Sequence, residues 1–356
     1  MKRSALVLIS LFLVLTLSAL AEAMTAEQLL GKMLYFDENL SNPAGQSCAS
    51  CHTPKAGFAD PDKTLPVSEG AVPGRFGTRN APSAAYAAFS PSFYFDGQMW
   101  IGGQFWDGRA ATLADQAKGP FLNPVEMNNT KDGVIAAVRT SHYSLLFKRV
   151  YGIHSLQNVE TAYDNVARAI AAFEGTKQVN RFSSRYDYYL KGKVMLTQQE
   201  LNGLALFNDP AKGNCSACHP STSVGTTPPL FTDFSYDNLG VPKNAEIEEL
   251  VGTAVPIDYG LGAIVGDTAE NGKFKVATLR NIARTGPYGH NGYFKTLKDI
   301  VHFYNTRDVE AWPAPEVPET VNKTELGNLG LTSGEEDAIV AFLMTLSDGY
   351  FCMYCR

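Results

Sequence analysis

The chain has 356 residues and a formal net charge of −6 at pH 7. At roughly 100 to 200 residues per domain, this length predicts two domains. Charges of both signs are spread along the sequence. Because this pattern gives no basic surface for nucleic acid or an anionic membrane, we exclude both as partners.

The N-terminus has the pattern of a cleavable signal peptide. Lys2 and Arg3 precede an apolar run over 5–20, and small residues offer a cleavage site after Ala23. This run is short for a spanning helix, and no later stretch holds about 18 uninterrupted apolar residues. We therefore expect residues 1–23 to be removed and the mature protein to be periplasmic or otherwise exported, without membrane insertion.

Two five-residue motifs, CASCH and CSACH, contain four of the six cysteines. Cys-x-x-Cys-His is the attachment signature of c-type haem, in which both thiols add to vinyl groups and the His binds the iron. A zinc site or a redox disulfide is the alternative, although neither requires a His directly after the second Cys. The predicted haem residues are Cys48, Cys51 and His52 in the first motif and Cys215, Cys218 and His219 in the second.

The repetition extends beyond these motifs. Gly-x-x-Leu-aromatic occurs at 31–35 and at 203–207, and Thr-Leu-x-Asp occurs at 112–115 and at 296–299. Other segments are helical in pattern, such as 159–173, where apolar residues recur at intervals of three and four. The sequence therefore predicts a helical protein made of two related halves.

The boundary between the halves is expected in a polar, Gly-containing stretch, which gives domains 24–190 and 191–356. Near the end of the chain, Ser333 and Glu336 form a capping-box pattern ahead of an apolar run, which predicts a final helix. The Pro-containing segment 308–330 is expected to be a long surface loop.

The ligand opposite the proximal His decides what a haem does. Between His52 and His142 there is no other histidine. Met99 and Met127 fall where the repeat places no ligand helix. The first haem is therefore expected to have an open distal side.

The segment that should cover this open side carries Gln116, Pro120 and Glu126 on a turn and loop. Cleavage of the O–O bond of a peroxide needs a group that removes a proton from one oxygen and returns it to the other. Because a carboxylate in a partly dry pocket can do both, we expect Glu126 to be the acid/base and Gln116 to orient it. A loop-capping Glu126 with a solvated Gln116 fits the spacing equally well.

In the second half, one helix face is made of Leu297, Ile300, Val301 and Tyr304. Tyr304 is the first choice for the distal ligand of the second haem and His302 the second, although a Tyr at this spacing is often a core residue. A phenolate favours ferric iron, whereas a Met thioether favours ferrous iron. A Tyr-ligated second haem would therefore store an oxidising equivalent.

These residues resemble the bacterial di-haem cytochrome c peroxidase family, and within it the MauG-type enzymes. Besides the two haem motifs, the resemblance is carried by FWDGRAATLADQAKGPFLNPVEM at 105–127 and VATLRNIARTGPYGHNGYFKTLKDIVHFYN at 276–305. It covers nearly all of the mature chain. It implies an all-α fold of two cytochrome c-like helical domains, each with one covalent c-type haem, that meet at an interface where a calcium ion often lies.

The resemblance also implies roles for single residues. Gln116, Pro120 and Glu126 match the distal pocket of the peroxide-reacting haem. Tyr304 stands where conventional peroxidases carry a Met ligand and MauG-type enzymes carry Tyr. The loop in which conventional members have a displaceable distal His contains no His in this sequence.

Asn80, with the carbonyls of Thr285 and Pro287, matches the calcium site of the family, and hard oxygen ligands suit that ion. Trp106 matches a residue of the electron path, with a core aromatic as the alternative. Gly213 stands where MauG-type enzymes have a Trp, so a relay through that position is not expected to be retained.

The chain ends with FCMYCR, in which Cys352 and Cys355 are not followed by a His. A disulfide is the expected state of this pair in an oxidising compartment. His290 is expected to be structural or to lie beside a haem propionate.

The resemblance implies an exported di-haem oxidoreductase that reacts with hydrogen peroxide and oxidises a partner protein at Trp or Tyr side chains. One alternative is a peroxidase that reduces hydrogen peroxide with electrons from a small cytochrome or copper protein. The other is a di-haem electron carrier without catalysis.

Overall fold

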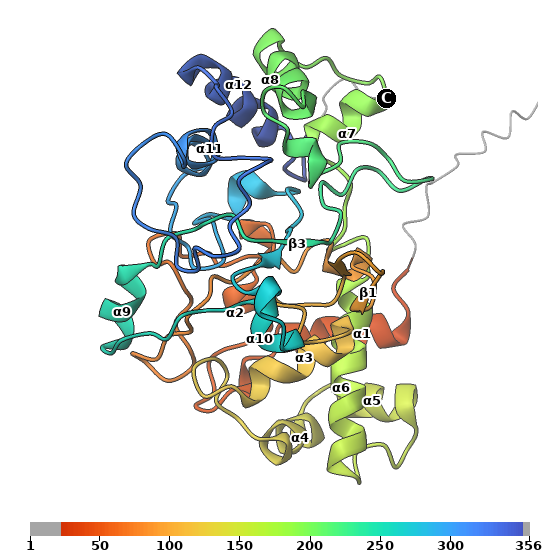
Figure 1. Cartoon of the computed structure of the whole chain (residues 1–356). Coiled ribbons are helices and arrows are strands. Elements are labelled where there is room, and N and C mark those ends of the chain that lie inside the picture. Colours follow the sequence, from red (N-terminus) through yellow and green to blue (C-terminus); the bar gives the residue numbers. More distant parts are fainter. Residues whose placement is uncertain (1–22, 352–356) are drawn as a thin grey trace, which may run out of the picture.

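The computed structural model describes residues 23–351. The signal peptide expected over 1–23 lies almost wholly outside the described residues, as do Cys352 and Cys355. The described chain is mainly helical, with short paired strands between the helices (Figure 1). The α-helices are α1 (Ala26–Tyr35), α2 (Cys48–Cys51), α3 (Leu113–Leu122), α4 (Lys131–Thr140), α5 (Ser144–Tyr151), α6 (Val159–Glu174), α7 (Arg185–Leu190), α8 (Gln198–Asn208), α9 (Ala245–Val251), α10 (Leu261–Val265), α11 (Leu297–Thr306) and α12 (Ser333–Met344).

Strand β1 (Tyr94–Phe95) pairs antiparallel with β2 (Trp100–Ile101), and β3 (Tyr236–Asp237) pairs antiparallel with β4 (Phe274–Lys275). Short 3-10 helices cover Glu38–Leu40, Pro54–Ala56, Ala87–Phe89, Cys215–Ala217, Thr268–Glu270 and Ile282–Arg284. Within residues 23–351, no helix is long and apolar enough to cross a lipid bilayer.

The interior contains two apolar clusters. Buried residues from Leu30 to Val179 form the first cluster, and buried residues from Tyr186 to Leu346 form the second. In Figure 1 the helices of the first half lie in the lower part of the molecule and α7, α8, α11 and α12 lie in the upper part. The domain division at residue 190 stays a prediction; α7, which ends there, contributes Tyr186 to the second cluster.

Each cluster is built around a close crossing of two helices, α1 with α6 and α8 with α12. A Cβ atom on Gly31 would lie 1.7 Å from the carbonyl oxygen of Ala169, and one on Gly203 would lie 1.9 Å from that of Ala338. Since a Cβ would collide with backbone in both places, only glycine permits these crossings. The repeated glycine in the sequence therefore marks the same backbone contact in each half.

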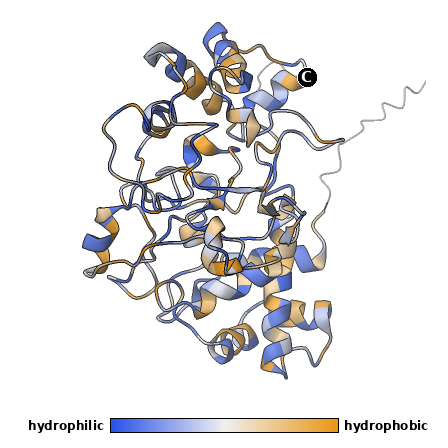
Figure 2. Ribbon diagram, viewed as in Figure 1, coloured by the Kyte–Doolittle hydropathy of each residue, from blue (hydrophilic) through white to orange (hydrophobic). Residues whose placement is uncertain are grey.

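The helices bury one face and expose the other, so both ends of the hydropathy scale appear along the same helices in Figure 2. Helices α3 and α11 also begin in the same way. Thr112 caps the first through the backbone N–H of Asp115, and Thr296 caps the second through that of Asp299. The Thr-Leu-x-Asp repeat is therefore a pair of matching helix starts.

The final helix is present, but its expected cap is wrong by one residue. The capping box of α12 is formed by Thr332 and Glu335. Ser333 and Glu336 lie inside the helix, where the carboxylate of Glu336 is buried and accepts a hydrogen bond from Asn305 Nδ2 at 2.6 Å. This tertiary contact fixes the helix start one residue earlier than the sequence pattern suggested.

A buried ion pair of the second half lies against the first half. Arg280 donates to both carboxylate oxygens of Asp187, at 3.0 and 2.9 Å, and both side chains are at most 1% exposed. The guanidinium group also lies over the rings of Tyr86 and Phe182, 5.0 and 4.4 Å from their centroids. A buried charge pair is tolerated only when its hydrogen bonds are complete. Because both rings belong to the first cluster, the guanidinium group of this pair also contacts the other half.

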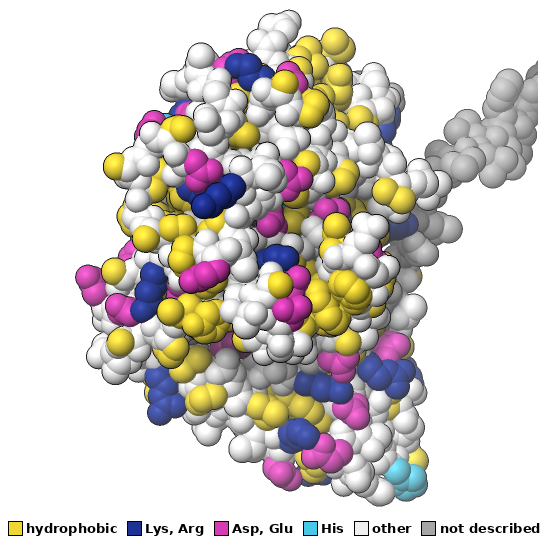
Figure 3. All heavy atoms as spheres, viewed as in Figure 1, with side chains coloured by type: hydrophobic (Ala, Val, Ile, Leu, Met, Phe, Trp, Pro, Cys, Tyr) yellow, Lys and Arg dark blue, Asp and Glu magenta, His cyan; other side chains and the backbone are white. Residues whose placement is uncertain are grey.

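The face in Figure 3 carries Lys and Arg side chains close to Asp and Glu side chains, with neutral and apolar surface between them. On this face there is no extended region of one charge sign.

Candidate functional site

The His residue of each motif is held by a backbone carbonyl. Nδ1 of His219 lies 2.8 Å from the oxygen of Phe231, and Nδ1 of His52 lies 3.3 Å from that of Phe58. In each case the contact leaves Nε2 as the ring nitrogen available to a metal. Burial lowers the pKa of both imidazoles, which favours the neutral form that binds a metal.

The two carbonyls are presented by unusual backbone. Phe58 has φ of 62° and Phe231 has φ of 54°, which places both in the left-handed region. A non-glycine residue held in this region costs on the order of 1–3 kcal/mol and is kept only where the surrounding structure imposes it. These residues were missed in the sequence, because an aromatic side chain gives no signal of left-handed backbone.

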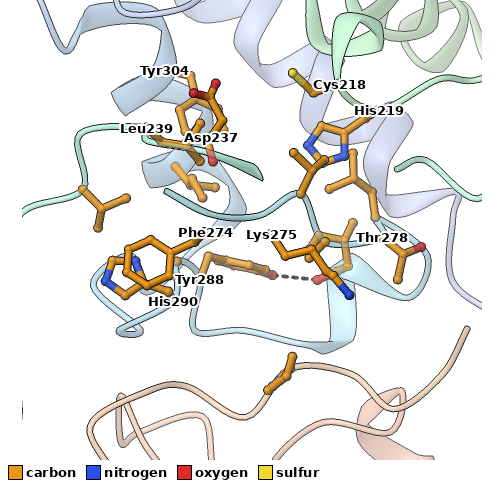
Figure 4. Close-up of a pocket in the computed structure, with 18 of the residues that line it drawn as sticks. Cys218, His219, Asp237, Leu239, Phe274, Lys275, Thr278, Tyr288, His290 and Tyr304 are labelled. Atoms are coloured by element: carbon orange, nitrogen blue, oxygen red, sulfur yellow. Dashed lines mark hydrogen bonds between the residues drawn. The ribbon is translucent and has the colours of Figure 1, made fainter. Parts of the chain in front are cut away.

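The second motif opens into a cavity lined by Cys215, Cys218 and His219. The predicted face of α11 lines the same cavity with Leu297, Ile300, Val301 and Tyr304. Figure 4 shows Tyr304 and His219 on opposite sides of it. Among the described residues that line this cavity there is no Met.

The second-choice ligand, His302, does not line this cavity. Its Nδ1 lies 2.9 Å from Glu336 Oε1 and its Nε2 lies 3.3 Å from Glu310 Oε2, on the outer side of α11. Burial raises the pKa of the Tyr304 phenol above its usual range. A phenolate at this position therefore requires a cation beside it.

Cys218 has a second set of neighbours. Its Sγ lies within 4.8 Å of carboxylate oxygens of Asp237 and Glu325, which is close enough for the three residues to hold a metal ion. Thioether formation at Cys218 would remove the thiolate from this set. The metal-site and haem-attachment interpretations of Cys218 therefore exclude each other.

Glu126 lies in the loop after α3, on the wall of another cavity, which is also lined by the exposed Arg109 and Asp115. Asn123 Nδ2 donates to Glu126 Oε1 at 2.7 Å. Burial raises the pKa of Glu126 above its ordinary value, so its protonated form persists to higher pH than that of an exposed Glu. A carboxyl group that can hold or release a proton is thus placed inside this cavity.

Gln116 and Pro120 belong to helix α3 rather than to the turn expected from the sequence, and they do not line the cavity of Glu126. The carbonyl of Pro120 accepts from the backbone N–H of Met127 at 3.1 Å, which folds the Glu126 loop back onto the helix. Since Pro120 has no N–H, it also leaves the Gln116 carbonyl without its usual helical donor. The side chain found beside Glu126 is that of Asn123, which the sequence did not reveal.

The predicted calcium residues Asn80, Thr285 and Pro287 all line the cavity of His219, as does Trp106. Asn80 Nδ2 donates to Pro66 O at 3.0 Å, which leaves Oδ1 as the side-chain oxygen available to a cation. The three residues therefore fit a site for a hard cation, and the calcium site stays a prediction.

The segment at 105–106 lies between the two cavities, since Phe105 lines both and Trp106 lines the cavity of His219. The indole N–H of Trp106 donates to the carbonyl of Asn80 at 2.9 Å. Gly213 also lines the cavity of His219, and a Cβ atom on Gly213 would lie 2.4 Å from the carbonyl oxygen of Leu206. A larger side chain at 213 would therefore require the backbone to move.

Both sites have the donors that a c-type haem requires, namely a pair of thiols and a neutral His with a free ring nitrogen. Residues 25–195 match the family model of the di-haem cytochrome c peroxidases. The chain is 40% identical over 342 residues to the methylamine utilization protein MauG of Paracoccus denitrificans, which covers 90% of this chain and 88% of that protein. It is 34% identical over 321 residues to the cytochrome c551 peroxidase of Nitrosomonas europaea, which covers 89% of this chain and 79% of that protein.

Comparison with solved structures leads to the same family. The diheme peroxidase BthA of Burkholderia thailandensis superimposes with a TM-score of 0.82 at 34% identity, over 90% of this chain and 86% of that protein. The resemblance found in the sequence is confirmed, and the family implies two c-type haems. The chain is therefore an oxidoreductase that belongs to the di-haem cytochrome c peroxidase family.

Proposed function

We propose that this protein is an exported enzyme that reacts with hydrogen peroxide in its first half and oxidises a partner protein, at Trp or Tyr side chains, from its second half. The observation that carries the proposal is the position of Tyr304, which faces His219 across the cavity of the second half (Figure 4). The resemblance to MauG-type enzymes predicts a Tyr in this place, whereas conventional peroxidases carry Met.

The same proposal assigns the attachment and metal-binding residues. The first haem is attached at Cys48 and Cys51 and bound by His52; the second is attached at Cys215 and Cys218 and bound by His219 and Tyr304; calcium is bound by Asn80 Oδ1 and the carbonyls of Thr285 and Pro287.

In the first half, Cys48, Cys51 and His52 would hold a haem, and its iron would supply the redox chemistry for the reduction of peroxide. Glu126 removes a proton from one peroxide oxygen and returns it to the other, so that water can leave. Asn123 holds Glu126 Oε1 at 2.7 Å, which leaves the second carboxylate oxygen for proton transfer. Pro120 and Gln116 act through helix α3, which positions this loop.

In the second half, His219 and Tyr304 would hold the iron of a haem from opposite sides of the cavity, which would leave peroxide no place to bind there. A phenolate is a hard, anionic ligand that favours oxidised iron, so Tyr304 keeps oxidising equivalents available to a partner. Trp106, between the two cavities, is the proposed path between the halves. Gly213 offers no aromatic ring to such a path.

The second candidate is a peroxidase that reduces hydrogen peroxide with electrons from a small cytochrome or copper protein. The identity of 34% with the cytochrome c551 peroxidase of Nitrosomonas europaea favours it. The third interpretation, a carrier without catalysis, does not agree with the membership of this enzyme family.

Stopped-flow mixing of the fully oxidised protein with hydrogen peroxide tests the proposal. We expect a spectral change without prior reduction, and Glu126→Gln should slow it by roughly 10² or more. Glu319→Gln, on an exposed side chain, is the control and should react at the wild-type rate. A requirement for prior reduction would favour the second candidate, and an unchanged rate in Glu126→Gln would remove this residue from the mechanism.

A further inference from the structure

Lys275 places an ammonium group inside the cavity of the second half. It lies on β4 and lines the cavity together with His219 and Tyr304 (Figure 4). Its Nζ donates to Ser90 Oγ at 3.0 Å and to the carbonyl oxygen of Gly103. Both acceptors are neutral, so neither balances the charge of the ammonium group.

No carboxylate is paired with this ammonium group in residues 23–351. The carboxylate of Asp107 raises the pKa of Lys275 by Coulombic attraction. This carboxylate is already bound by Arg79 at 2.6 Å and by Arg109 at 2.9 Å. A buried charge without an opposite charge is costly. Accordingly, burial lowers the pKa of Lys275 to about 7.

The rest of the cavity wall is acidic. Among the described lining residues Lys275 is the sole Lys or Arg. The carboxylates on the wall are those of Asp237, Asp258, Glu316 and Glu325. Asp258 is bound by Arg79 at 2.6 Å, and Glu316 lies 3.8 Å from His290 Nε2. Lys275 is therefore the one Lys or Arg side chain of the described wall that can pair with an anionic group entering this cavity.

We propose that the ammonium group of Lys275 is the counter-ion of a propionate of the haem in this cavity and raises the reduction potential of that haem. Lys275 has no anionic partner among the described side chains, and a haem would supply one, because it carries propionate carboxylates on an otherwise apolar ring. A fixed positive charge stabilises the reduced haem, which has one positive charge less than the oxidised haem.

Lys275 lies next to Trp106, in the segment between the two cavities. Its backbone N–H donates to the carbonyl of Trp106 at 2.8 Å, and the indole of Trp106 donates to the carbonyl of Asn80 at 2.9 Å. A propionate paired with Lys275 would therefore lie next to the segment that separates the two cavities. This inference requires a haem in the cavity but not the peroxide reaction.

Spectroelectrochemical titration without peroxide, with the two haems resolved by EPR, tests the inference. Lys275→Met should lower the potential of the second haem, so that its ratio of reduced to oxidised form falls roughly tenfold at a fixed potential. Lys275→Arg, which keeps the charge, should retain most of the wild-type value. Lys63→Met, on an exposed side chain, is the control and should change nothing.

Haem content and circular dichroism show whether each variant is folded. If Lys275→Met does not fold, Lys275→Gln keeps a donor for Ser90 and Gly103, and the resonance Raman propionate band should shift in it. An unchanged potential in Lys275→Met, an equal loss in Lys275→Arg, or an unshifted propionate band in Lys275→Gln would overturn the inference. None of these readouts depends on Glu126, so their failure is distinct from a failure of the peroxide assay.

Discussion

Glu174 is a carboxyl group in the interior of the first half. It is the last residue of α6 and 5% exposed, and its Oε2 has no hydrogen-bond partner among the described residues. Burial raises its pKa to about 8, and the C-terminal end of a helix also disfavours negative charge. The matched crossings align Phe173 with Phe342, so Glu174 takes the place that Leu343 has in the second half.

The proton on Glu174 makes stability depend on pH. The unfolded chain releases it near the ordinary value of 4.5, whereas the native state keeps it to about pH 8. The stabilisation linked to this proton is therefore complete below pH 4.5 and is lost as pH rises towards 8. At about 1.4 kcal/mol for each pH unit, the loss between pH 5 and pH 7.5 is about 3 kcal/mol.

Glu174→Gln removes this titration. Relative to wild type, its free energy of unfolding should rise by about 3 kcal/mol between pH 5 and pH 7.5. Guanidinium chloride unfolding followed by circular dichroism at several pH values measures the difference. Glu249→Gln, on an exposed side chain of α9, is the control and should follow wild type. A difference between Glu174→Gln and wild type that does not change with pH would show that the buried carboxyl group is already ionised, and would refute the reasoning.

Two other substitutions test the scaffold by the same unfolding measurement. Gly203→Ala should lower the free energy of unfolding by about 1–3 kcal/mol, because its Cβ would meet Ala338 O at 1.9 Å. Gly334→Ala is the control and should not lower it, because a Cβ on Gly334 has nothing within 4 Å. Equal stabilities of the two variants would contradict the close contact of α8 with α12. Arg280→Met should cost about 3–5 kcal/mol by leaving Asp187 buried and unpaired. Adding Asp187→Leu should recover part of that loss, and no recovery would mean that the ion pair is not its cause.

The helices of the core were predictable because apolar spacing alone selects a buried face. The pattern over 159–173 became α6, and the face that includes Tyr304 became the cavity side of α11. The start of α12 was not predictable to the residue. Thr332 and Ser333 each have a Glu three positions later, so two capping boxes overlap in the sequence, and the burial of Glu336 selects between them.

The parts of the site that could not be predicted depend on backbone conformation or on distant contacts. Nothing in the sequence marks the left-handed backbone at Phe58 and Phe231. Asn123 was missed as the partner of Glu126, because its side chain reaches the carboxylate only after the chain turns at the end of α3. Lys275 is an ordinary Lys in the sequence, and its isolation from carboxylates becomes visible only in the fold.

The glycine crossings of α1 with α6 and of α8 with α12 explain how the two halves can share one backbone arrangement and still differ in their side chains. Since the helices touch through backbone atoms at Gly31 and Gly203, the frame of each half does not rely on the side chains that point away from the contact. The first half therefore has the acidic Glu174 where the second half has Leu343, although the same backbone contact holds the helices of both halves together. Side chains outside the contact can differ in chemistry while the arrangement of the main chain stays the same.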